Sequence, residues 1–251
     1  MKEYSNLREF FNRNKKVALA FSGGVDSAYL LAEAAGCGVN IKAYFIKSRF
    51  QPDFELADAR CLAEEFSVDF EVIEADVLSD ETICENPKKR CYYCKQKIFK
   101  TLIDAANRDG FDLIIDGTNA SDEAGDRPGM KALEEMNVVS PLRLCGMRKD
   151  EIREKSKELG LFTWDKPSYA CLATRIPQGT RINEEKLAKV EAAEDILKDM
   201  GFSDFRVRYF CGCAKIQVKE NQMEKVFKNR TEIKEALSPY FESVFLDLEE
   251  R

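Results

Sequence analysis

Apolar and polar positions follow two periods over most of the chain. Short apolar runs, which predict buried strands, begin at Val17, Ile41 and Leu113, and a further strand is predicted over Asp69–Asp76. Between them, apolar residues recur at helical spacing and predict helices over Asp26–Ala35, Asp53–Phe66, Cys91–Asp109 and Arg148–Leu159. Strands that alternate with helices in this way form βαβ units in a parallel sheet covered on both faces. We therefore predict an α/β fold.

The pattern changes near residue 166. Residues 166–182 carry two prolines and no periodicity, and we predict an active-site loop there that is also a hinge. Beyond it come an amphipathic helix over Asn183–Met200, for which Asn183 is the candidate N-cap, two short strands, a further helical stretch and a last strand. We predict an α/β domain over residues 1–165 and a small α+β domain over residues 183–251. The small domain would bind substrate or mediate oligomerisation.

The most specific motif follows the first predicted strand. There the chain reads S-G-G-V-D-S, and the helical pattern begins directly after the glycines. Glycines let the backbone come close to a ligand, and the first N–H groups of a helix have no partner within it. The serine hydroxyls can donate to a phosphate, and Asp26 can cap the helix. We predict an anion site formed by Ser22, Gly23, Gly24, Asp26 and Ser27.

This string resembles the PP-loop of ATP pyrophosphatases, enzymes that split ATP into AMP and pyrophosphate. It is not a Walker A loop, because the Gly-Lys-Ser/Thr ending is absent. Ligands of parallel sheets bind at the carboxyl ends of the strands. Ser48 and Gly117 follow two other predicted strands, and Arg127 comes shortly after Gly117. We predict that these three residues contribute to the same nucleotide site.

The composition limits which residue types can take part in the chemistry, and it indicates the cellular compartment and the kind of partner. The chain has 251 residues, nine cysteines and no histidine, so no histidine can act as a base or a metal ligand. An odd number of cysteines without an export signal favours a reducing cytoplasm over a disulfide framework. The net charge of -6 argues against nucleic acid as a partner. No apolar run is long enough to cross a bilayer.

Cys91 and Cys94 form a C-x-x-C motif, and Cys171 lies in the string S-Y-A-C-L-A-T-R. The motif has three interpretations: a redox dithiol, half of a zinc site, or part of an iron–sulfur site. A zinc site without histidine needs two further cysteines, for which Cys211 and Cys213 are the candidates. Three thiolates on a [4Fe–4S] cluster leave one iron without a protein ligand, where a small sulfur species can bind. We prefer this interpretation, although no spacing rule brings Cys171 to the motif.

Several charged residues have two interpretations. Arg206 and Arg208 alternate with an apolar residue on a predicted strand, so both point to one face. They form either a solvated surface or a clamp for a phosphate or carboxylate, to which the planar guanidinium is suited. Arg175 is open between the same two roles, and Glu194, in the predicted helix before this strand, is equally open between a solvated and a functional position.

Six motifs, taken in order, resemble the LarE family of PP-loop sulfurtransferases: SGGVDS, NPKKRCYYCK, DGTNASDEAGDRPG, SPLRLCGMRKDEIR, KPSYACLATRIPQGTRI and FRVRYF. The resemblance implies a reaction in two halves. ATP adenylylates a carboxylate of pyridinium-3,5-biscarboxylic acid mononucleotide, and sulfur then displaces AMP to leave a thiocarboxylate. Repetition on the second carboxylate gives the dithiocarboxylate that later carries nickel in the nickel-pincer nucleotide cofactor.

The resemblance also implies a sulfur source and a set of site residues. Family members with the C-x-x-C bind a [4Fe–4S] cluster through three cysteines, which a sulfide donor reloads. Members without it surrender the sulfur of the cysteine at the position of Cys171. Mg²⁺ would be held with help from Asp26. The ligands of the cluster would be Cys91, Cys94 and Cys171, and the residues near substrate or phosphates would be Arg175, Glu194, Arg206 and Arg208. Family members assemble as hexamers built from trimers.

Two other functions remain open from the sequence. PP-loop enzymes with a C-x-x-C and a third cysteine also thiolate tRNA, which would require a basic RNA surface. A non-catalytic module that binds a nucleotide or an iron–sulfur cluster is the second alternative. A second metal or redox role for Cys211 and Cys213 is also open, because the family pattern leads us to expect a cysteine-free stretch after the arginine strand.

Overall fold

The structure, a computed structural model, describes residues 3–122 and 128–251. The chain divides into two compact units. The first comprises Met1–Val77 and Lys89–Lys166, and the second comprises Leu78–Lys88 and Pro167–Arg251. The chain therefore passes into the second unit and back before it enters that unit again at Pro167.

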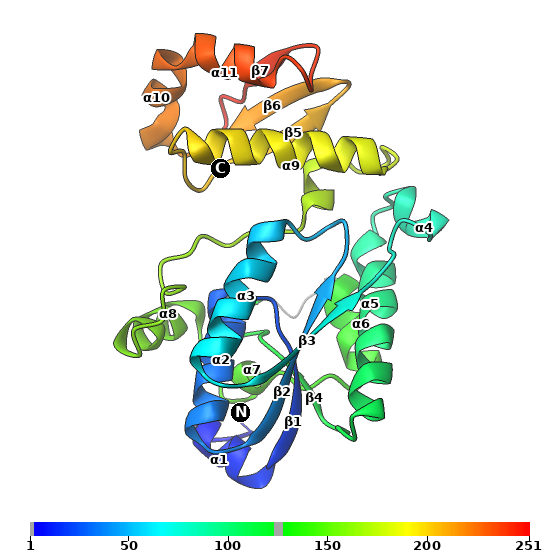
Figure 1. Ribbon diagram of the computed structural model, residues 1–251, viewed down its shortest axis with the longest axis vertical. Coiled ribbons are helices and arrows are strands. Elements are labelled where there is room, and N and C mark those ends of the chain that lie inside the picture. The colour runs from blue at the N-terminus through cyan, green and yellow to red at the C-terminus, as the bar shows by residue number, and fades with distance from the viewer. Residues whose placement is uncertain (1–2, 123–127) are drawn as a thin grey trace. The chain divides into compact units, whose positions relative to one another are not determined.

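The first unit is built on a parallel sheet with the strand order β3-β2-β1-β4 (Figure 1). Its strands are β1 (Lys16–Ala20), β2 (Asn40–Lys47), β3 (Asp69–Glu74) and β4 (Ile114–Asp116). β1 lies between β2 and β4, with Leu19 opposite Ala43 on one side and Ile115 on the other. The predicted parallel sheet is confirmed. All these strands end at the same edge, as parallel strands must.

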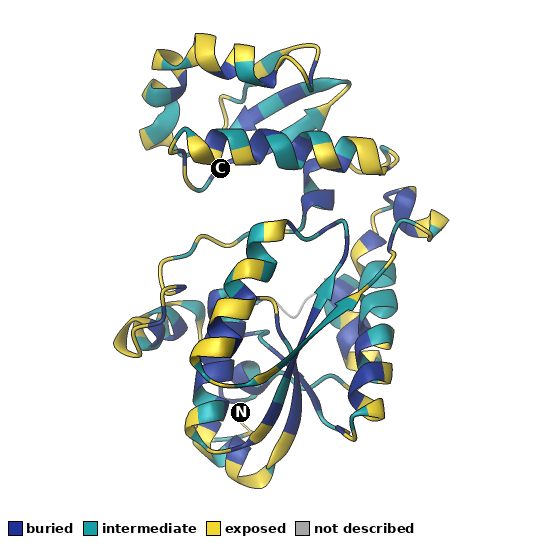
Figure 2. Ribbon diagram, in the orientation of Figure 1, coloured by how far each residue is buried: buried dark blue, intermediate teal, exposed yellow. Residues whose placement is uncertain are grey.

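Helices cover both faces of this sheet. Its helices are α1 (Leu7–Arg13), α2 (Val25–Gly36), α3 (Asp53–Glu65), α5 (Arg90–Arg108), α6 (Pro128–Glu135), α7 (Pro141–Leu144) and α8 (Lys149–Glu158). One apolar core joins α1, α2 and α3 to the face that carries Leu19 and Phe45, and a second joins α5 and α6 to the face that carries Ala18 and Tyr44. Figure 2 shows the buried sides of these helices turned to the sheet and their exposed sides turned away.

The second unit combines a small sheet with helices. The strand order is β5-β6-β7, with β5 and β6 antiparallel and β6 and β7 parallel. Its elements are α4 (Glu81–Cys84), a 3₁₀ turn (Leu172–Arg175), α9 (Glu184–Asp199), β5 (Arg206–Phe210), β6 (Cys213–Gln217), a second 3₁₀ turn (Glu220–Gln222), α10 (Met223–Lys228), α11 (Arg230–Leu237) and β7 (Val244–Leu246). The predicted α+β character of this part of the chain is thus present.

Segment 78–88 belongs to the second unit because its backbone and one side chain bond there. The Cys84 carbonyl accepts from the Ile182 N–H at 2.7 Å, and the Asn86 carbonyl accepts from the Gly179 N–H at 2.9 Å. The Asn86 amide, which is 1% exposed, donates to the carbonyl of Pro177 at 2.8 Å. The sequence pattern predicted only irregular chain here, and α4 was not foreseen.

The observed N-cap agrees with the sequence-based prediction for α9 and differs from it for α2. The Asn183 side chain accepts from the Lys186 N–H, so the predicted N-cap of α9 is confirmed. The prediction that Asp26 caps α2 is wrong. The N-cap is Gly24, which makes no side-chain cap bond, and the Asp26 carboxylate is directed to residues outside the helix. Across the described residues, no helix combines the length and apolar character that crossing a membrane requires.

Candidate active site

A cavity of about 550 Å³ opens at the carboxyl ends of the strands of the first unit. The PP-loop forms one side of it through Ser22, Gly24, Asp26 and Ser27. Other walls come from β2, from the stretch of α5 between Cys91 and Leu102, and from the end of β4 with the chain that follows it. Their residues include Tyr44, Phe45, Ile46, Cys91, Lys95, Ile98, Asp116, Gly117 and Thr118. The cavity lies where ligands of parallel α/β sheets bind.

Hydroxyl groups hold the PP-loop in shape. The Ser22 and Ser27 hydroxyl oxygens lie 3.1 Å apart, and the Ser27 hydroxyl donates to the Gly24 carbonyl at 3.1 Å. The first N–H groups of α2, from Val25 onward, have no carbonyl four residues earlier within the helix. Because Gly24, Asp26 and Ser27 line the cavity, the N-terminus of α2 and the positive end of its dipole lie at the cavity wall, which suits an anion.

Two glycines are required by close packing around this loop. Gly23 has a φ of +68°, and a Cβ there would lie 3.0 Å from the Glu55 carbonyl oxygen. At Gly117 a Cβ would lie 2.9 Å from the backbone nitrogen of Ser27. Gly117 therefore lets the end of β4 pack directly against the first turn of α2. Gly23 itself does not line the cavity, so its contribution is to the shape of the loop.

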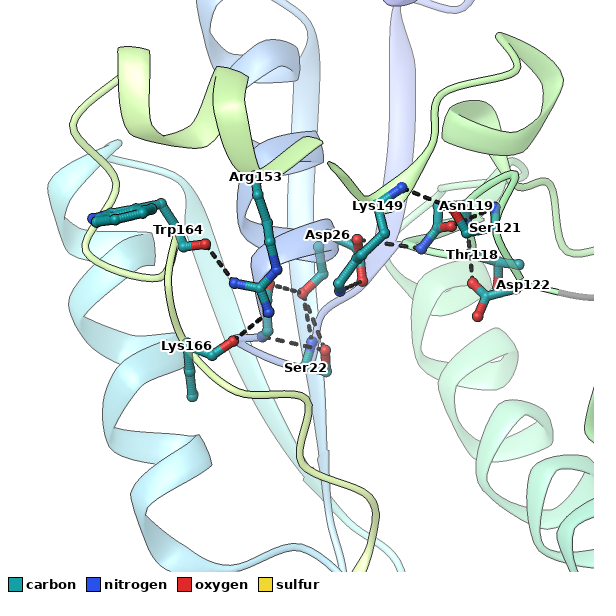
Figure 3. Close-up of polar contacts among 12 residues, drawn as sticks. Ser22, Asp26, Thr118, Asn119, Ser121, Asp122, Lys149, Arg153, Trp164 and Lys166 are labelled. Carbon is teal, nitrogen blue, oxygen red and sulfur yellow. Dashed lines mark hydrogen bonds and ion pairs between the residues drawn. The ribbon is translucent and has the colours of Figure 1, made fainter. Parts of the chain in front are cut away.

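An ion pair connects the PP-loop helix to α8 (Figure 3). The Lys149 ammonium donates to Asp26 Oδ2 at 2.5 Å, and the Asn119 amide donates to Asp26 Oδ1 at 3.3 Å. Burial raises the pKa of Asp26, the Lys149 ammonium lowers it, and the Asp122 carboxylate raises it again. The Ser121 hydroxyl accepts from the Lys149 N–H at 2.9 Å, which fixes the start of α8 beside this pair.

A second lysine reaches the loop from residues 164–166, which follow α8 (Figure 3). The Lys166 ammonium pairs with Asp58 Oδ2 at 2.5 Å and lies 3.4 Å from the Gly23 carbonyl oxygen. Arg153 holds this chain in place by donating to the carbonyls of Trp164 and Lys166 at 2.5 and 2.7 Å. The end of the first unit is thereby anchored at the PP-loop.

Two other residues, Ser48 and Arg127, were predicted to contribute to the nucleotide site. Ser48 is buried, and its hydroxyl donates to the Gln51 side-chain oxygen at 2.6 Å. Because Gln51 lines the cavity and Ser48 does not, Ser48 orients a neighbour of the site. Arg127 lies outside the described residues.

Cys91 lies in the first turn of α5 and Cys94 at the start of the second, three residues apart and therefore on one face of the helix. Cys91 is exposed and lines the cavity, while Cys94 is partly buried. The N-terminus of a helix stabilises thiolates. Cys171 is partly buried and lies in the second unit, directly before the first 3₁₀ turn. Within the described parts of the chain, no three side chains of the metal-ligating types lie close enough to hold a metal ion.

In the second unit, Arg175 and Glu194 bind each other. The Arg175 guanidinium, 1% exposed, donates to both Glu194 oxygens at 2.7 and 3.1 Å. It also donates to the Ala170 carbonyl at 2.8 Å, and the Val207 N–H donates to Glu194 at 2.9 Å. These bonds fix the chain on either side of Cys171 to α9 and β5.

Arg206 and Arg208 reach the same stretch of chain. The Arg206 guanidinium donates to the Ser168 carbonyl at 2.6 Å, and that of Arg208 donates to the Thr174 carbonyl at 3.1 Å. The Tyr169 ring lies against both Arg175 and Arg206, at 4.5 and 5.0 Å from its centroid. Burial, followed by repulsion from Arg175, lowers the pKa of Arg206 to about 10. Arg206 remains charged at neutral pH.

Several residues of these sites were not predicted from the sequence. They are Tyr44, Lys95 and Asp116 in the cavity wall, Lys149 and Lys166 at the PP-loop, and Tyr169 in the second unit. Asp116 had a usable signal, because it ends a buried strand directly before Gly117. The lysines had none, since each lies on a polar stretch far along the chain from its partner.

Comparison with known proteins gives three informative relatives, although no family model matches the chain. A protein of Lactiplantibacillus plantarum named pyridinium-3,5-bisthiocarboxylic acid mononucleotide synthase is 34% identical over 238 residues, 93% of this chain and 86% of that one. An uncharacterized protein of Synechocystis is 36% identical over 222 residues, 88% of this chain and 82% of its own. The tRNA-specific 2-thiouridylase MnmA of Pseudothermotoga lettingae is 27% identical over 258 residues, 86% and 72% of the two chains.

The parallel sheet, the S-G-G-V-D-S loop at the end of its first strand and the similarity to MnmA define the class: the first unit has the fold of the PP-loop ATP pyrophosphatases. Similarity to the synthase extends over nearly the whole chain and includes the second unit. The chain belongs to the LarE family, as its six motifs indicate.

Proposed function

We propose that this protein is an ATP-dependent sulfurtransferase that converts the carboxylates of pyridinium-3,5-biscarboxylic acid mononucleotide to thiocarboxylates. The observation that carries the proposal is the PP-loop cavity with Cys91 in its wall, which brings an anion site and a thiol into one space. The name of the Lactiplantibacillus plantarum relative supports the choice of substrate.

In the first half of the reaction, a substrate carboxylate would attack the α-phosphorus of ATP and displace pyrophosphate. A carboxylate is a poor electrophile, and adenylation supplies its leaving group. The N–H groups at the start of α2 and the hydroxyls of Ser22 and Ser27 suit the pyrophosphate. Lys95, which lines the cavity opposite the loop, can add a positive charge near the reacting phosphates.

Carboxylates in the cavity suit Mg²⁺ on the triphosphate. Asp26 and Asp122 both line it, and the Asp122 carboxylate raises the pKa of Asp26. Hard divalent cations prefer carboxylate oxygens, and Mg²⁺ there would neutralise charge during transfer. The Lys149 ammonium now occupies one oxygen of Asp26, so we propose that Lys149 exchanges this partner for a phosphate when Mg²⁺ and ATP bind.

In the second half, sulfur would displace AMP. We propose that Cys91, Cys94 and Cys171 hold a [4Fe–4S] cluster. The pairing of two thiols on one face at the start of a long helix fits such a cluster, since thiolate ligands are stabilised there. When bound, the cluster would offer an iron without a protein ligand, to which hydrosulfide can bind. The bonds of Arg175, Arg206 and Arg208 would hold the Cys171 segment in the conformation that this requires.

Iron and acid-labile sulfide content under anaerobic conditions tests this proposal. We expect about four irons per chain in the wild type, lost in each of Cys91→Ala, Cys94→Ala and Cys171→Ala. Cys61→Ala is the matched control, because Cys61 is an exposed cysteine on α3. With hydrosulfide added, the wild type should form more than one thiocarboxylate per chain. Absence of iron after anaerobic reconstitution would contradict the cluster and leave Cys171 itself as the sulfur source.

A tRNA thiolase is the second candidate, because MnmA is among the relatives. Salt-sensitive binding of tRNA, and release of pyrophosphate that depends on tRNA, would favour it. The acidic net charge of -6 supports the small-molecule substrate.

A further inference from the structure

The turn between β5 and β6 carries two cysteines that the proposed function does not use. Phe210 pairs with Cys213 across the antiparallel strands, so Cys211 and Gly212 are the two central residues of the turn. Their φ angles are +47° and +85°, and both residues are therefore in the left-handed region that a type I′ hairpin turn requires. Asn, Asp or Gly is preferred at the first of these positions.

A cysteine has no conformational reason to occupy this position. Its Cβ is crowded in the left-handed region, as it is for other non-glycine residues, and its thiol cannot make the local bonds that favour Asn or Asp there. The cost of the residue suggests a use for its side chain. Cys211 is exposed, so its sulfur can be reached from solvent.

The turn brings the second thiol to the first. Consecutive Cα atoms are about 3.8 Å apart, and the turn bends the chain between residues 211 and 213, which suits the Cα separation of about 4.4–6.8 Å in disulfides. The Cys213 thiol lies 3.8 Å from the Cys211 carbonyl oxygen, so it is already directed to this residue. Two thiols alone do not complete a metal site, and in the described chain no third ligand of the metal-binding types joins them.

We propose that Cys211 and Cys213 are a redox-active thiol pair that takes sulfane sulfur from a persulfide donor and releases it as hydrosulfide. The Cys211 thiolate attacks the outer sulfur of a donor R–S–SH, which leaves as R–SH, and Cys211 becomes a persulfide. The Cys213 thiolate then attacks the inner sulfur, the Cys211 Sγ. A Cys211–Cys213 disulfide forms and hydrosulfide leaves. The sulfane sulfur gains two electrons, the two thiols lose them, and a dithiol reductant restores the pair.

This inference rests on the proposed function in one respect: hydrosulfide is the form of sulfur that the proposed transfer consumes. The pair would let the protein draw on sulfur stored as persulfides. The release step itself requires neither ATP nor the PP-loop, so it can be measured separately from sulfur insertion.

The test uses the full-length reduced protein under anaerobic conditions, with glutathione persulfide as the probe and no other reductant. We expect the wild type to release about one hydrosulfide per chain beyond the background of the Cys211→Ser, Cys213→Ser double variant. Trypsin gives the peptide Tyr209–Lys215, which contains both cysteines, and it should become about 2 Da lighter as the disulfide forms.

The single variants separate the two steps. In Cys213→Ser the extra release should be lost, and the peptide should become about 32 Da heavier because the persulfide accumulates on Cys211. In Cys211→Ser both the release and the mass change should be absent. Cys61→Ser, which removes an exposed thiol in the first unit, should behave as the wild type.

Equal release from the wild type and the double variant would overturn the proposal, as would an unchanged peptide mass after release. ATP-dependent pyrophosphate release, assayed on the same variants, should remain at the wild-type level. If pyrophosphate release is absent from the wild type while the pair still forms its disulfide, the proposed function fails and this inference does not.

Discussion

At the scale of single residues, Gly117 shows how closely the nucleotide cavity is built. The end of β4 packs against the first turn of α2, and a Cβ at Gly117 would lie 2.9 Å from the Ser27 nitrogen and 3.2 Å from its Cα. Both contacts are with backbone, which cannot rotate away. The position of the PP-loop donors therefore depends on the absence of this side chain.

Gly117→Ala should weaken ATP binding more than it weakens the fold. The added Cβ must displace the N-terminus of α2 by some tenths of an ångström, and donors so misplaced bind phosphate at least about 10-fold less tightly. Calorimetric titration with a non-hydrolysable ATP analogue measures this. Gly36→Ala, where nothing lies within 4 Å of the added Cβ, is the control and should bind as the wild type. Equal affinities in the two variants would contradict this account of Gly117.

Lys149 should set the acid limb of the pH–activity profile through Asp26. Burial raises the pKa of Asp26 and Lys149 lowers it, so Lys149→Met should raise the pKa further. If ionised Asp26 is needed for Mg²⁺–ATP, the acid limb of the profile then moves to higher pH. Pyrophosphate release measured from pH 5 upward tests this. Lys131→Met, which removes an exposed lysine on α6, should leave the limb in place. A shift to lower pH would exclude the proposed coupling.

At the scale of elements, α9 and β5 together support the Cys171 segment. The Arg175–Glu194 pair joins α9 to this segment and also accepts the β5 N–H of Val207. Such a buried pair adds little net stability against apolar residues of the same size, but removal of one partner leaves an unpaired buried charge. The pair is therefore a strong constraint on conformation.

Arg175→Met should lower the free energy of unfolding of the second unit by about 3–5 kcal/mol. Replacing Glu194 by Leu as well should restore most of it, since neither charge then remains. Arg181→Met is the control: the two side chains of its ion pair with Glu81 are 55% and 72% exposed, so its loss should leave the free energy of unfolding nearly unchanged. Hydrogen exchange of the β5 amides, followed during a urea titration, measures the free energy of unfolding of the second unit in each variant. A double variant no more stable than Arg175→Met would show that the bonds to Ala170 and Val207 dominate.

At the scale of the whole molecule, the chain crosses between the two units three times. Asn86 bonds the first segment that enters the second unit, residues 78–88, to the rest of that unit. It lies in segment 78–88 and donates to the carbonyls of Ile176 and Pro177, close to the last crossing. Its φ of +55° is left-handed, which Asn tolerates better than most residues. Both properties are lost in alanine.

Asn86→Ala should therefore loosen residues 176–182. Asn137→Ala is the matched control, because Asn137 has nearly the same φ, +56°, but is exposed. We expect Asn86→Ala to cost about 1–3 kcal/mol more than the control, because it leaves the carbonyl of the buried Ile176 without this donor. Faster exchange of the Gly179 and Ile182 amides would locate the effect. Equal costs in both variants would mean that backbone conformation alone, and not the Asn86 bonds, matters here.

The sequence alone predicted the alternation of the main helices and strands, the parallel sheet and the PP-loop at its edge, but not the short helix α4. Each of these is expressed in a local pattern: apolar residues with a period of 2 or 3.6, or a string such as S-G-G-V-D-S. Asn183 at the start of α9 is a further case, since a cap bonds only three residues ahead. The family membership followed from strings of the same kind.

Only the tertiary structure decided which distant residues meet. Asp26 was predicted to cap its own helix, and instead it pairs with Lys149, 123 positions away. Arg175 and Glu194, predicted near substrate, are bonded to each other, and segment 78–88 joins the second unit. The spacing of charged side chains along the sequence does not indicate which distant residue each of them pairs with. Which two come together depends on how helices and strands pack and on the cost of burying a charge without its counter-ion.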